Sequence, residues 1–327
     1  MNSRWAPIIQ TALRTPSPHN TQPWRLRITD DQHATLFMER ARTLPDEDVT
    51  GHFLRCAMGM FLESMRIISA NSGLTLQHFL IDEDVGDPMI RFAELELNGP
   101  SEPSQYPDDL FHARRTSRLP SNGARIDPQV TTLLKTLSSH NGHRYFQFDD
   151  PELIEAVILE NIRAVFHDLN VSAYHREISR WFRYSDAEAQ AKSDGLDYRC
   201  MRVPSMELRL MKQLPQVMSW PITRGVIRRI YRRQLGKVSH VGLLGGPFFD
   251  DAAAVRAGTF LMRFWLELAR QKLYLHPFGN LVTNSQAKAR IQALTGLEDV
   301  WLVFRVGYTD QPPQSFRRPF NKVLMND

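Results

Sequence analysis

The sequence predicts an α+β protein in which one chain of 327 residues is built from two related halves. Long stretches with apolar residues at helical spacing are followed, in both parts of the chain, by short segments that alternate as strands do. The clearest of these stretches occurs a second time, which indicates duplication. We therefore expect central sheets flanked by long helices.

The recurring stretch is residues 48 to 72, EDVTGHFLRCAMGMFLESMRIISAN, followed by LTLQHFL. A strand is expected after each copy, in MIRFAELEL (89 to 97) and VWLVFRVGY (300 to 308). Because the spacing holds through helix, turn and strand, duplication explains it better than chance similarity of two amphipathic helices. At an offset of 199 the identical pairs are Gly59 and Gly258, Phe61 and Phe260, Leu62 and Leu261, Leu74 and Leu273, Leu76 and Leu275, and Phe79 and Phe278.

The first half is predicted to cover residues 1 to 105. It begins with a helix in SRWAPIIQTALR (3 to 14) and, after a loop, a strand in WRLRI (24 to 28). The second half, residues 106 to 327, opens with HARRTSRLP (112 to 120). At the place of the first loop it has SSHNGHRYFQFDD (138 to 150), which keeps a Ser-x-His-Asn echo but lacks Gln-Pro-Trp. Each half therefore holds one half of a site.

A segment of the second half, residues 175 to 236, is predicted to form a helical lid. It is rich in methionine and tryptophan, and unbranched methionine fills irregular gaps in a core. The same residues could also cover a planar ligand, and the sequence leaves both interpretations open. The methionines are Met201, Met206, Met211 and Met218.

Composition excludes several classes of protein. With 42% hydrophobic residues the chain can bury one large core or two smaller ones. No apolar run reaches membrane-spanning length, and the first residues lack the pattern of a signal peptide. Cys56 and Cys200 lie far apart without a CxxC partner, so we expect no metal site and a cytoplasmic location.

The net charge of +4 is mild, and much of it lies in TRGVIRRIYRRQLGK (223 to 237). We interpret this run as a solvated helix face, with phosphate binding as the alternative. Neither a nucleic-acid partner nor a membrane is expected, because no zinc finger, RNA-recognition signature or sustained basic amphipathic helix is present.

The loop TPSPHNTQPW (15 to 24) is stiffer than a plain connector needs to be, because Pro16, Pro18 and Pro23 each fix a φ angle. It also concentrates polar side chains. Rigid loops rich in polar side chains usually bind a ligand. The polar residues of this loop that could do so are Ser17, His19, Asn20 and Gln22.

Arginines mark the other candidate segments. RRTSR carries Arg114, Arg115, Thr116 and Arg118, a dense set of donors for a phosphate. Near the end, QSFRRPF adds Arg317 and Arg318, which would complete a cationic pocket if the terminus folds back.

Other catalytic classes lack their motifs. Ser17 has no GxSxG context, and the chain contains no HExxH, no GxxxxGK[ST] and no GxGxxG after a first strand. Since no protein nucleophile or metal site is indicated, a bound organic cofactor would have to carry any redox chemistry.

These motifs resemble those of the FMN-dependent nitroreductase superfamily. TPSPHNTQPW resembles its SPSxxNxQPW loop, RRTSR its RRSxR motif, and RVGYTD followed by RRPF its closing strand and terminal basic pair. The combination looks most like the duplicated Acg-like branch, and it spans nearly the whole chain. The resemblance implies a nitroreductase-like fold in which both partners of a homodimer are fused, hence a monomer with one FMN.

The resemblance also implies roles for the site residues. Arg114, Thr116 and Arg118 would contact the ribityl phosphate and the pyrimidine edge of FMN, Arg115 or Arg118 would stabilise reduced flavin, and Arg317 or Arg318 would close on the phosphate. Pro16, Ser17, Pro18 and Asn20 would meet the flavin from the other half. His19 belongs to the same loop, whereas Gln22 and Trp24 would anchor it.

In LHPFGN, Phe278 and Gly279 stand where many members of the superfamily have Glu-Gly beside the flavin N5, and the Gly279 N–H could bond N5. The expected function is transfer of hydride through N5, from NADH or NADPH to a small electrophile such as a nitro compound, quinone or enone, or in the opposite direction as a dehydrogenase. A flavin-sequestering protein with a closed lid is the alternative, since the glutamate is missing.

Overall fold

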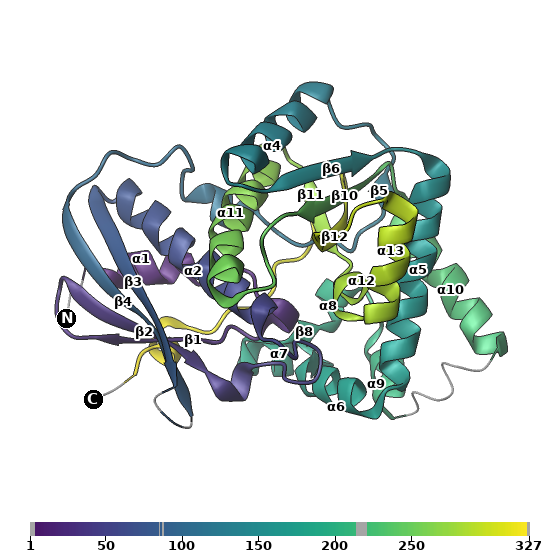
Figure 1. Cartoon of the computed structure of the whole chain (residues 1–327). Helices are drawn as coiled ribbons and strands as arrows, with labels where there is room; N and C mark the ends of the chain where they lie inside the picture. The colour runs from purple at the N-terminus through teal and green to yellow at the C-terminus, as the bar shows by residue number, and fades with distance from the viewer. Residues whose placement is uncertain (1–3, 85, 87, 214–220, 326–327) are drawn as a thin grey trace.

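The computed structural model describes residues 4–84, 86, 88–213 and 221–325, and it confirms the α+β class. Figure 1 shows two antiparallel sheets of four strands, each with a long helix on the face turned toward the other. The two long helices, α2 (His52–Asn71) and α11 (Asp251–Arg270), lie between the sheets. Apolar side chains of both helices belong to one continuous core.

The first sheet has the strand order β1-β2-β4-β3, and helix α1 precedes it in the chain. Leu26 pairs with Leu36 and Leu36 with Ala93, which places the buried side chains of three strands on the face that meets the helices. The elements are α1 (Trp5–Ala12), η1 (Pro18–Asn20), β1 (Trp24–Ile28), β2 (His33–Glu39), η2 (Arg40–Arg42), β3 (Leu74–Asp84) and β4 (Met89–Pro100).

The second sheet repeats this topology. Its order β6-β10-β12-β11 equals that of the first sheet when α4, β6, β10, α11, β11 and β12 are matched in chain order to α1, β1, β2, α2, β3 and β4. The shared topology supports duplication independently of residue identities. The elements are α3 (Asp109–Ala113), β5 (Ser121–Asn122), α4 (Pro128–His140), β6 (Arg144–Phe148), β10 (His240–Gly245), β11 (Tyr274–Pro277), α12 (Asn280–Thr283), α13 (Ser285–Thr295), β12 (Val300–Gly307) and α14 (Phe320–Val323).

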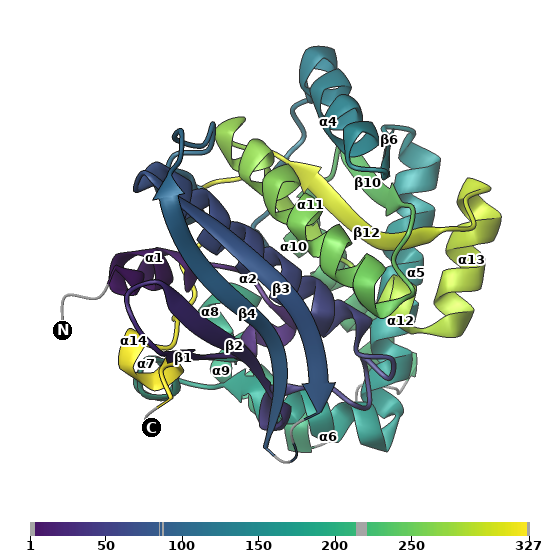
Figure 2. The same ribbon diagram turned by 60° about the vertical axis from the view of Figure 1, so that its left-hand side comes forward.

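The repeated glycines lie at the crossing of α2 and α11, which run side by side in Figure 2. A Cβ on Gly59 would stand 2.1 Å from the Val255 carbonyl oxygen, and one on Gly258 would stand 2.0 Å from that of Cys56. Cys56 and Val255 are themselves equivalent at the offset of 199, so the contact is the same in both directions. This reciprocity is typical of a two-fold interface and fits a fused dimer.

Helix α2 is shorter at its start than the repeat suggests. Gly51 adopts φ 71°, a left-handed conformation, and residues before it form turns. The Asp48 carboxylate accepts hydrogen bonds from the N–H groups of Phe53 and Leu54, which have no acceptor inside the helix.

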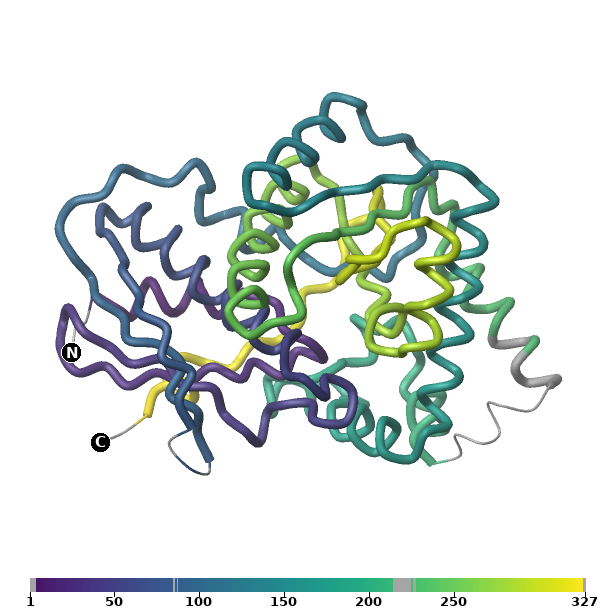
Figure 3. The backbone as a smooth tube through the Cα atoms, viewed as in Figure 1, coloured from purple at the N-terminus to yellow at the C-terminus, as the bar shows by residue number. Residues whose placement is uncertain are grey.

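The main departure from symmetry is an insertion between β6 and β10 in the second half. Figure 3 shows this stretch of chain leaving the second sheet and passing beneath the first half before it returns. It includes the predicted lid, residues 175 to 236, of which 214–220, with Met218, lie outside the described residues. Its elements are α5 (Pro151–Asn170), α6 (Ser172–Trp181), β7 (Phe182–Arg183), α7 (Asp186–Lys192), β8 (Leu196–Asp197), α8 (Tyr198–Met201), α9 (Ser205–Gln213), α10 (Pro221–Leu235) and β9 (Gly236–Lys237).

The C-terminal segment crosses back to the first half (Figure 1). After β12 it runs along the first sheet, where the Met325 N–H donates to the Leu26 carbonyl at 2.8 Å and Arg25 Nη2 donates to the Leu324 carbonyl at 3.1 Å. The fold-back considered from the sequence therefore occurs. The boundary between residues 105 and 106 stays a prediction.

The basic run 223 to 237 lies mostly on α10, whose described arginines Arg228, Arg229, Arg232 and Arg233 are exposed, as a solvated helix face requires. Of these, Arg232 pairs with Glu155 at 2.6 Å. Among the described helices, none combines the length and apolar character needed to cross a membrane.

Candidate functional site

The loop that follows α1 is held in a strained conformation. His19, Asn20 and Gln22 all have positive φ, at 48°, 56° and 51°, where residues other than glycine are uncommon. Pro18 occupies the first position of the short helix η1, and the Ser17 hydroxyl accepts a hydrogen bond from the Gln22 N–H at 2.9 Å. Such strain persists only where surrounding contacts enforce it, and it concentrates at functional sites.

Gln22 supplies several of these contacts. Its side chain is fully buried; Nε2 donates to the Ser193 carbonyl at 2.9 Å, and Oε1 accepts from the Arg318 N–H at 2.9 Å. Trp24 is also fully buried and stacks on Phe61 at 4.6 Å. With its amide already bonded within the protein, Gln22 is placed to position the loop, as is Trp24.

The two terminal arginines have different surroundings. The Arg318 guanidinium is buried, donates to the Gln22 and Trp24 carbonyls and forms an ion pair with Glu39 at 3.3 Å. Arg317 Nη1 instead donates to Asn20 Oδ1 at 2.8 Å, while its Nε is buried without a partner. Both arginines therefore contact the loop, but Arg318 is fully engaged within the protein, whereas Arg317 keeps an N–H group without a partner.

The RRTSR segment lies beside the strand that leads to Phe278. Thr116 forms a bridge with Leu275 of β11, and the Arg118 guanidinium donates to the Cys200 carbonyl at 3.3 Å. Arg115 Nη1 donates to the Pro312 carbonyl at 2.6 Å. The segment thus joins β11, the insertion and the C-terminal segment.

Arg114 connects this segment to the first half. It is 3% exposed, lies over the Trp265 ring at 4.9 Å, and donates from Nη2 to the Arg14 carbonyl at 2.9 Å. Its other nitrogens, Nε and Nη1, are buried without hydrogen-bond partners. The Arg14 Nε is unpartnered in the same way.

These contacts assemble a cationic cluster from both halves of the chain. None of its members forms an ion pair within the described part of the protein, whereas the buried Arg183 pairs with Asp194. The buried Arg305 also lacks an ion pair, but its guanidinium donates to three backbone carbonyls. Buried charges are normally paired, so a set of unpaired guanidinium groups indicates that an anion belongs here. The members are Arg14, Arg114, Arg115, Arg118 and Arg317.

The pKa values of the cluster reflect this lack of counter-charge. Burial, together with the charge of Arg115, lowers the pKa of Arg14 to about 10. Burial and the charge of Arg14 lower the pKa of Arg114 to about 9. The pKa of Arg317 falls well below its ordinary value through burial and the charges of Arg14 and Arg114. A bound dianion would supply the missing negative charge and would raise these pKa values again.

Arg14 was not predicted as a site residue. The available signal was its position directly before the TPSPHN loop, but one arginine at the end of an amphipathic helix is ordinary. Its importance follows from Arg114 and Arg317, which come from segments about 100 and 300 residues away in sequence.

The insertion is fastened to the strained loop. The Gly195 N–H donates to the Asn20 carbonyl at 3.2 Å, and Asn20 Nδ2 donates to the Gly195 carbonyl at the same distance. Beside this contact, Asp194 is shared by Arg42 of the first half, at 2.8 Å, and by Arg183. The segment around α7 and α8 therefore forms one wall of the site, and hydrogen bonds and an ion pair attach it to the first half.

The predicted methionines differ in position. Met206 is 78% exposed, so it covers nothing, and Met201 and Met211 are partly buried. The side chains that connect the insertion to the loop are polar, which the methionine pattern did not suggest.

Phe278 and Gly279 follow β11. Phe278 is 2% exposed and belongs to the core of the second half. The Gly279 N–H has no hydrogen-bond partner in the described residues, and a Cβ at this position would meet nothing within 4 Å. The backbone of Gly279 is thus available to a ligand, while the Phe278 side chain is not.

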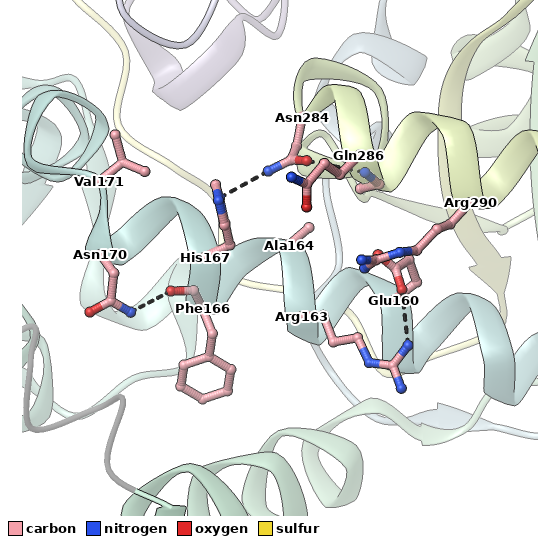
Figure 4. A pocket seen from close by; sticks show the side chains of 11 residues that line it. Glu160, Arg163, Ala164, Phe166, His167, Asn170, Val171, Asn284, Gln286 and Arg290 are labelled. Carbon is pink, nitrogen blue, oxygen red and sulfur yellow. Dashed lines mark hydrogen bonds and ion pairs between the residues drawn. The ribbon is translucent and has the colours of Figure 1, made fainter.

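A cavity of about 760 Å³ lies elsewhere, between α5 and α13 (Figure 4). In it, Arg163 and Arg290 share the buried carboxylate of Glu160, which already balances part of their charge. It includes none of the predicted site residues. The described residues also contain no group of three or more His, Cys, Asp or Glu suited to a metal ion.

Comparison with known proteins adds to these observations. Over 182 residues, the chain is 30% identical to a protein of Mycobacterium tuberculosis named "Putative NAD(P)H nitroreductase acg", found in strains CDC 1551 and H37Rv. The resemblance to the nitroreductases is confirmed. The match covers 53% of this chain and 52% of the relative, so the chain spans about half the length of the curated relatives it matches. No family model matches.

Solved structures of nitroreductases also align with the chain. The FMN-dependent nitroreductase NfnB of Mycobacterium smegmatis, in complex with NADPH, aligns over 67% of this chain and 97% of its own, with 13% identity and a TM-score of 0.41. A nitroreductase of Desulfitobacterium hafniense with bound FMN aligns over 66% and 96%, with 10% identity and a TM-score of 0.40. These similarities are weak, and the fold described above rests on the chain's own strand order.

Proposed function

We propose that the protein is an FMN-dependent oxidoreductase that holds one FMN per chain between its two halves. The observation that carries this proposal is the cationic cluster: five arginines from both halves that form no ion pair among the described residues, three of which (Arg14, Arg114 and Arg317) have buried N–H groups that lack acceptors. A phosphate monoester supplies two negative charges and several acceptor oxygens, which matches that donor set.

In this proposal, Arg14, Arg114 and Arg317 hold the phosphate, and Arg115, Thr116 and Arg118 lie toward the ring system. Ser17, Pro18 and Asn20 form the wall from the first half, with Pro16 behind them, and the Gly279 N–H donates to the flavin. When bound, FMN supplies hydride transfer through N5. A guanidinium near the pyrimidine edge would stabilise the charge that develops there on reduction.

The proposed electron donor is NADH or NADPH, and the proposed acceptor is a small electrophile such as a nitro compound, a quinone or an enone. Support comes from the M. tuberculosis relative, whose name specifies an NAD(P)H nitroreductase. Dehydrogenation of a small metabolite uses the same chemistry in the opposite direction. A monomer that mimics a dimer and a cytoplasmic location stay predictions, as does the absence of a nucleic-acid or membrane partner.

A second candidate is a flavin-sequestering protein. It is favoured by one observation, the bonded wall formed by Ser193, Asp194 and Gly195 against the strained loop. If this wall excludes nicotinamide, the protein would retain FMN without turnover. Phe278, where many nitroreductases have glutamate, agrees with this alternative.

Anaerobic spectroscopy tests both candidates. The protein is reconstituted with FMN, the bound flavin is quantified per chain, and NADPH and then NADH are added. Prompt bleaching at one FMN per chain supports the reductase, whereas a full complement of flavin that stays yellow supports sequestration or a dehydrogenase. The double variant R114A/R118A should lose FMN, while R125A, which removes an arginine 82% exposed, should retain it. Failure of the wild-type protein to bind FMN would refute both candidates.

A further inference from the structure

His19 of the strained loop forms an ion pair with Glu47, from the segment between η2 and α2. The contact joins His19 Nε2 to Glu47 Oε2. Its side chain is 18% exposed, and that of Glu47 is 17% exposed. Because the Glu47 carboxylate contacts Nε2, it fixes the orientation of the imidazole ring, with Nε2 facing the protein.

The opposite ring nitrogen is left open. His19 Nδ1 has no hydrogen-bond partner in the described part of the chain, and it is not among the fully buried side-chain atoms that lack one. Nδ1 therefore retains access to a bound molecule. In the neighbouring residues of the loop, by contrast, the side chains of Asn20 and Gln22 are engaged with the C-terminal segment and the insertion.

Glu47 is positioned by a second carboxylate. Glu177, a buried residue of α6, accepts hydrogen bonds from the N–H groups of Asp46 at 3.1 Å and Glu47 at 2.8 Å. Glu177 of the insertion therefore fixes the backbone at Asp46 and Glu47, and Glu47 in turn fixes His19. The positive φ of His19 is maintained by the same contacts.

The charges around His19 favour its protonated form. Burial by itself lowers the pKa of His19, but the charge and hydrogen bond of Glu47, aided by the charge of Glu177, raise it above its ordinary value. Arg118 opposes this rise and is close enough to act on the imidazole. His19 is therefore near the cationic cluster, and its pairing with Glu47 favours the protonated imidazole.

We propose that His19 is a proton donor to the molecule reduced at this site, with Glu47 and Glu177 as positioning residues. The inference rests on the proposed oxidoreductase function. It also accounts for how the site can act without a glutamate before Gly279, since His19 provides a proton from the opposite half of the chain.

The step balances for a nitroaromatic acceptor. His19 Nδ1–H would give its proton to one nitro oxygen, while bound FMN in its reduced form would serve as the hydride source for the other, so the acceptor would gain two electrons and two hydrogens. The resulting dihydroxyamine would lose water to leave the nitroso product. Neutral His19 would then regain a proton from solvent, and the cofactor would be left oxidised.

The protonation of His19 can be measured without flavin. In the flavin-free protein, a ¹⁵N NMR titration of the histidines should give His19 a pKa above its ordinary value, and E47Q should lower it. His33, which pairs with Asp30 on the surface, is the internal control and should titrate identically in both proteins. A neutral His19 at pH 7 in the wild-type protein would overturn the proposal.

The kinetic test uses FMN-loaded, pre-reduced protein in a stopped-flow instrument. Nitrofurazone should reoxidise H19N roughly 100-fold to 10,000-fold more slowly than wild type, the usual contribution of a general acid. Ferricyanide removes electrons without needing a proton and should reoxidise H19N at the wild-type rate. Asparagine suits the left-handed backbone at this position, so the variant should fold.

The pH profile separates proton donation from a structural role. The wild-type nitrofurazone rate should fall as pH rises through the pKa of His19, E47Q should move this fall to lower pH, and H33Q should not change it. Equal slowing of H19N with both oxidants, or an unchanged nitrofurazone rate, would refute proton donation. Lack of FMN binding or of flavin reduction would instead refute the proposed function, and the NMR result would be unaffected.

Discussion

At the scale of single residues, the site depends on which buried charges have partners. Arg318 and Arg317 are neighbours in sequence, yet one is paired with Glu39 and bonded to backbone carbonyls while the other belongs to the cationic cluster. Neutralising them should therefore have different consequences, because Arg318 is the donor to the buried carbonyls of Gln22 and Trp24, and its loss would leave them without that partner.

This difference can be tested with Arg14 and Arg318. R14A should weaken FMN binding about 10-fold to 150-fold, which corresponds to about 1.5 to 3 kcal/mol for a charge-assisted hydrogen bond, and should not lower the unfolding free energy of the flavin-free protein. R318A should lower that free energy by about 2 kcal/mol or more, because buried backbone carbonyls lose their donor. Titration calorimetry and urea unfolding measure the two quantities. Equal loss of stability in both variants would contradict the assignment of Arg14 to the anion site.

His19 also links stability to pH. Since the pKa of His19 is raised in the folded protein, the stabilisation is fully present below the unfolded value, about 6.5, and is lost as pH rises through the folded value. We expect E47Q to lower the unfolding free energy at pH 5.5 more than at pH 8.5. Urea unfolding of both proteins at the two pH values measures this, and a larger effect at pH 8.5 would show that the pKa is not raised.

At the scale of elements, the crossing of α2 and α11 determines how the two halves meet. The glycines allow backbone-to-backbone contact, and any side chain there would stand about 2 Å from a carbonyl oxygen of the other helix. Strain of this kind cannot be relieved by a change of rotamer, because the obstacle is backbone.

G59A should therefore lower the unfolding free energy by about 3 kcal/mol or more. It should also weaken FMN binding, since the cationic cluster draws on both halves. G99A is the matched control, because a Cβ at Gly99 meets nothing within 4 Å. Calorimetric unfolding and flavin titration test both effects. A G59A protein as stable as G99A would mean that the helices do not pack as closely as described.

At the scale of the whole molecule, the cationic cluster combines Arg14 of the first half with four arginines of the second half. Burying arginines without counter-ions opposes folding, so an anion that binds only the folded state should stabilise it. This is the thermodynamic reason to expect the flavin-free protein to be the less stable form.

FMN should raise the unfolding free energy by about 2.7 kcal/mol when present at 100 times its Kd. Inorganic phosphate should give a smaller rise in Tm, because it engages the cluster without the rest of the site. In R14A/R114A both effects should disappear, which scanning calorimetry can measure. Stabilisation of wild type by riboflavin equal to that by FMN would show that the cluster does not bind the phosphate.

The α+β class, the duplicated helix and strand, and the loop and arginine segments proposed for the site could all be predicted from the sequence. These features have local signals: apolar periodicity specifies an element, prolines stiffen the 15 to 24 loop, and identical residues at a fixed offset show the repeat. The matching strand order of the two sheets was not predicted and is seen only in the structure.

Only the tertiary structure decided which side chains act together. Arg14 lies beside Arg114 and Arg317, Arg318 pairs with Glu39, and His19 pairs with Glu47, although none of these contacts has a sequence signature. The physical reason is that burial and pairing of charges depend on contacts between segments that are up to about 300 residues apart. Such contacts exist only once the C-terminal segment and the insertion have packed against the first half.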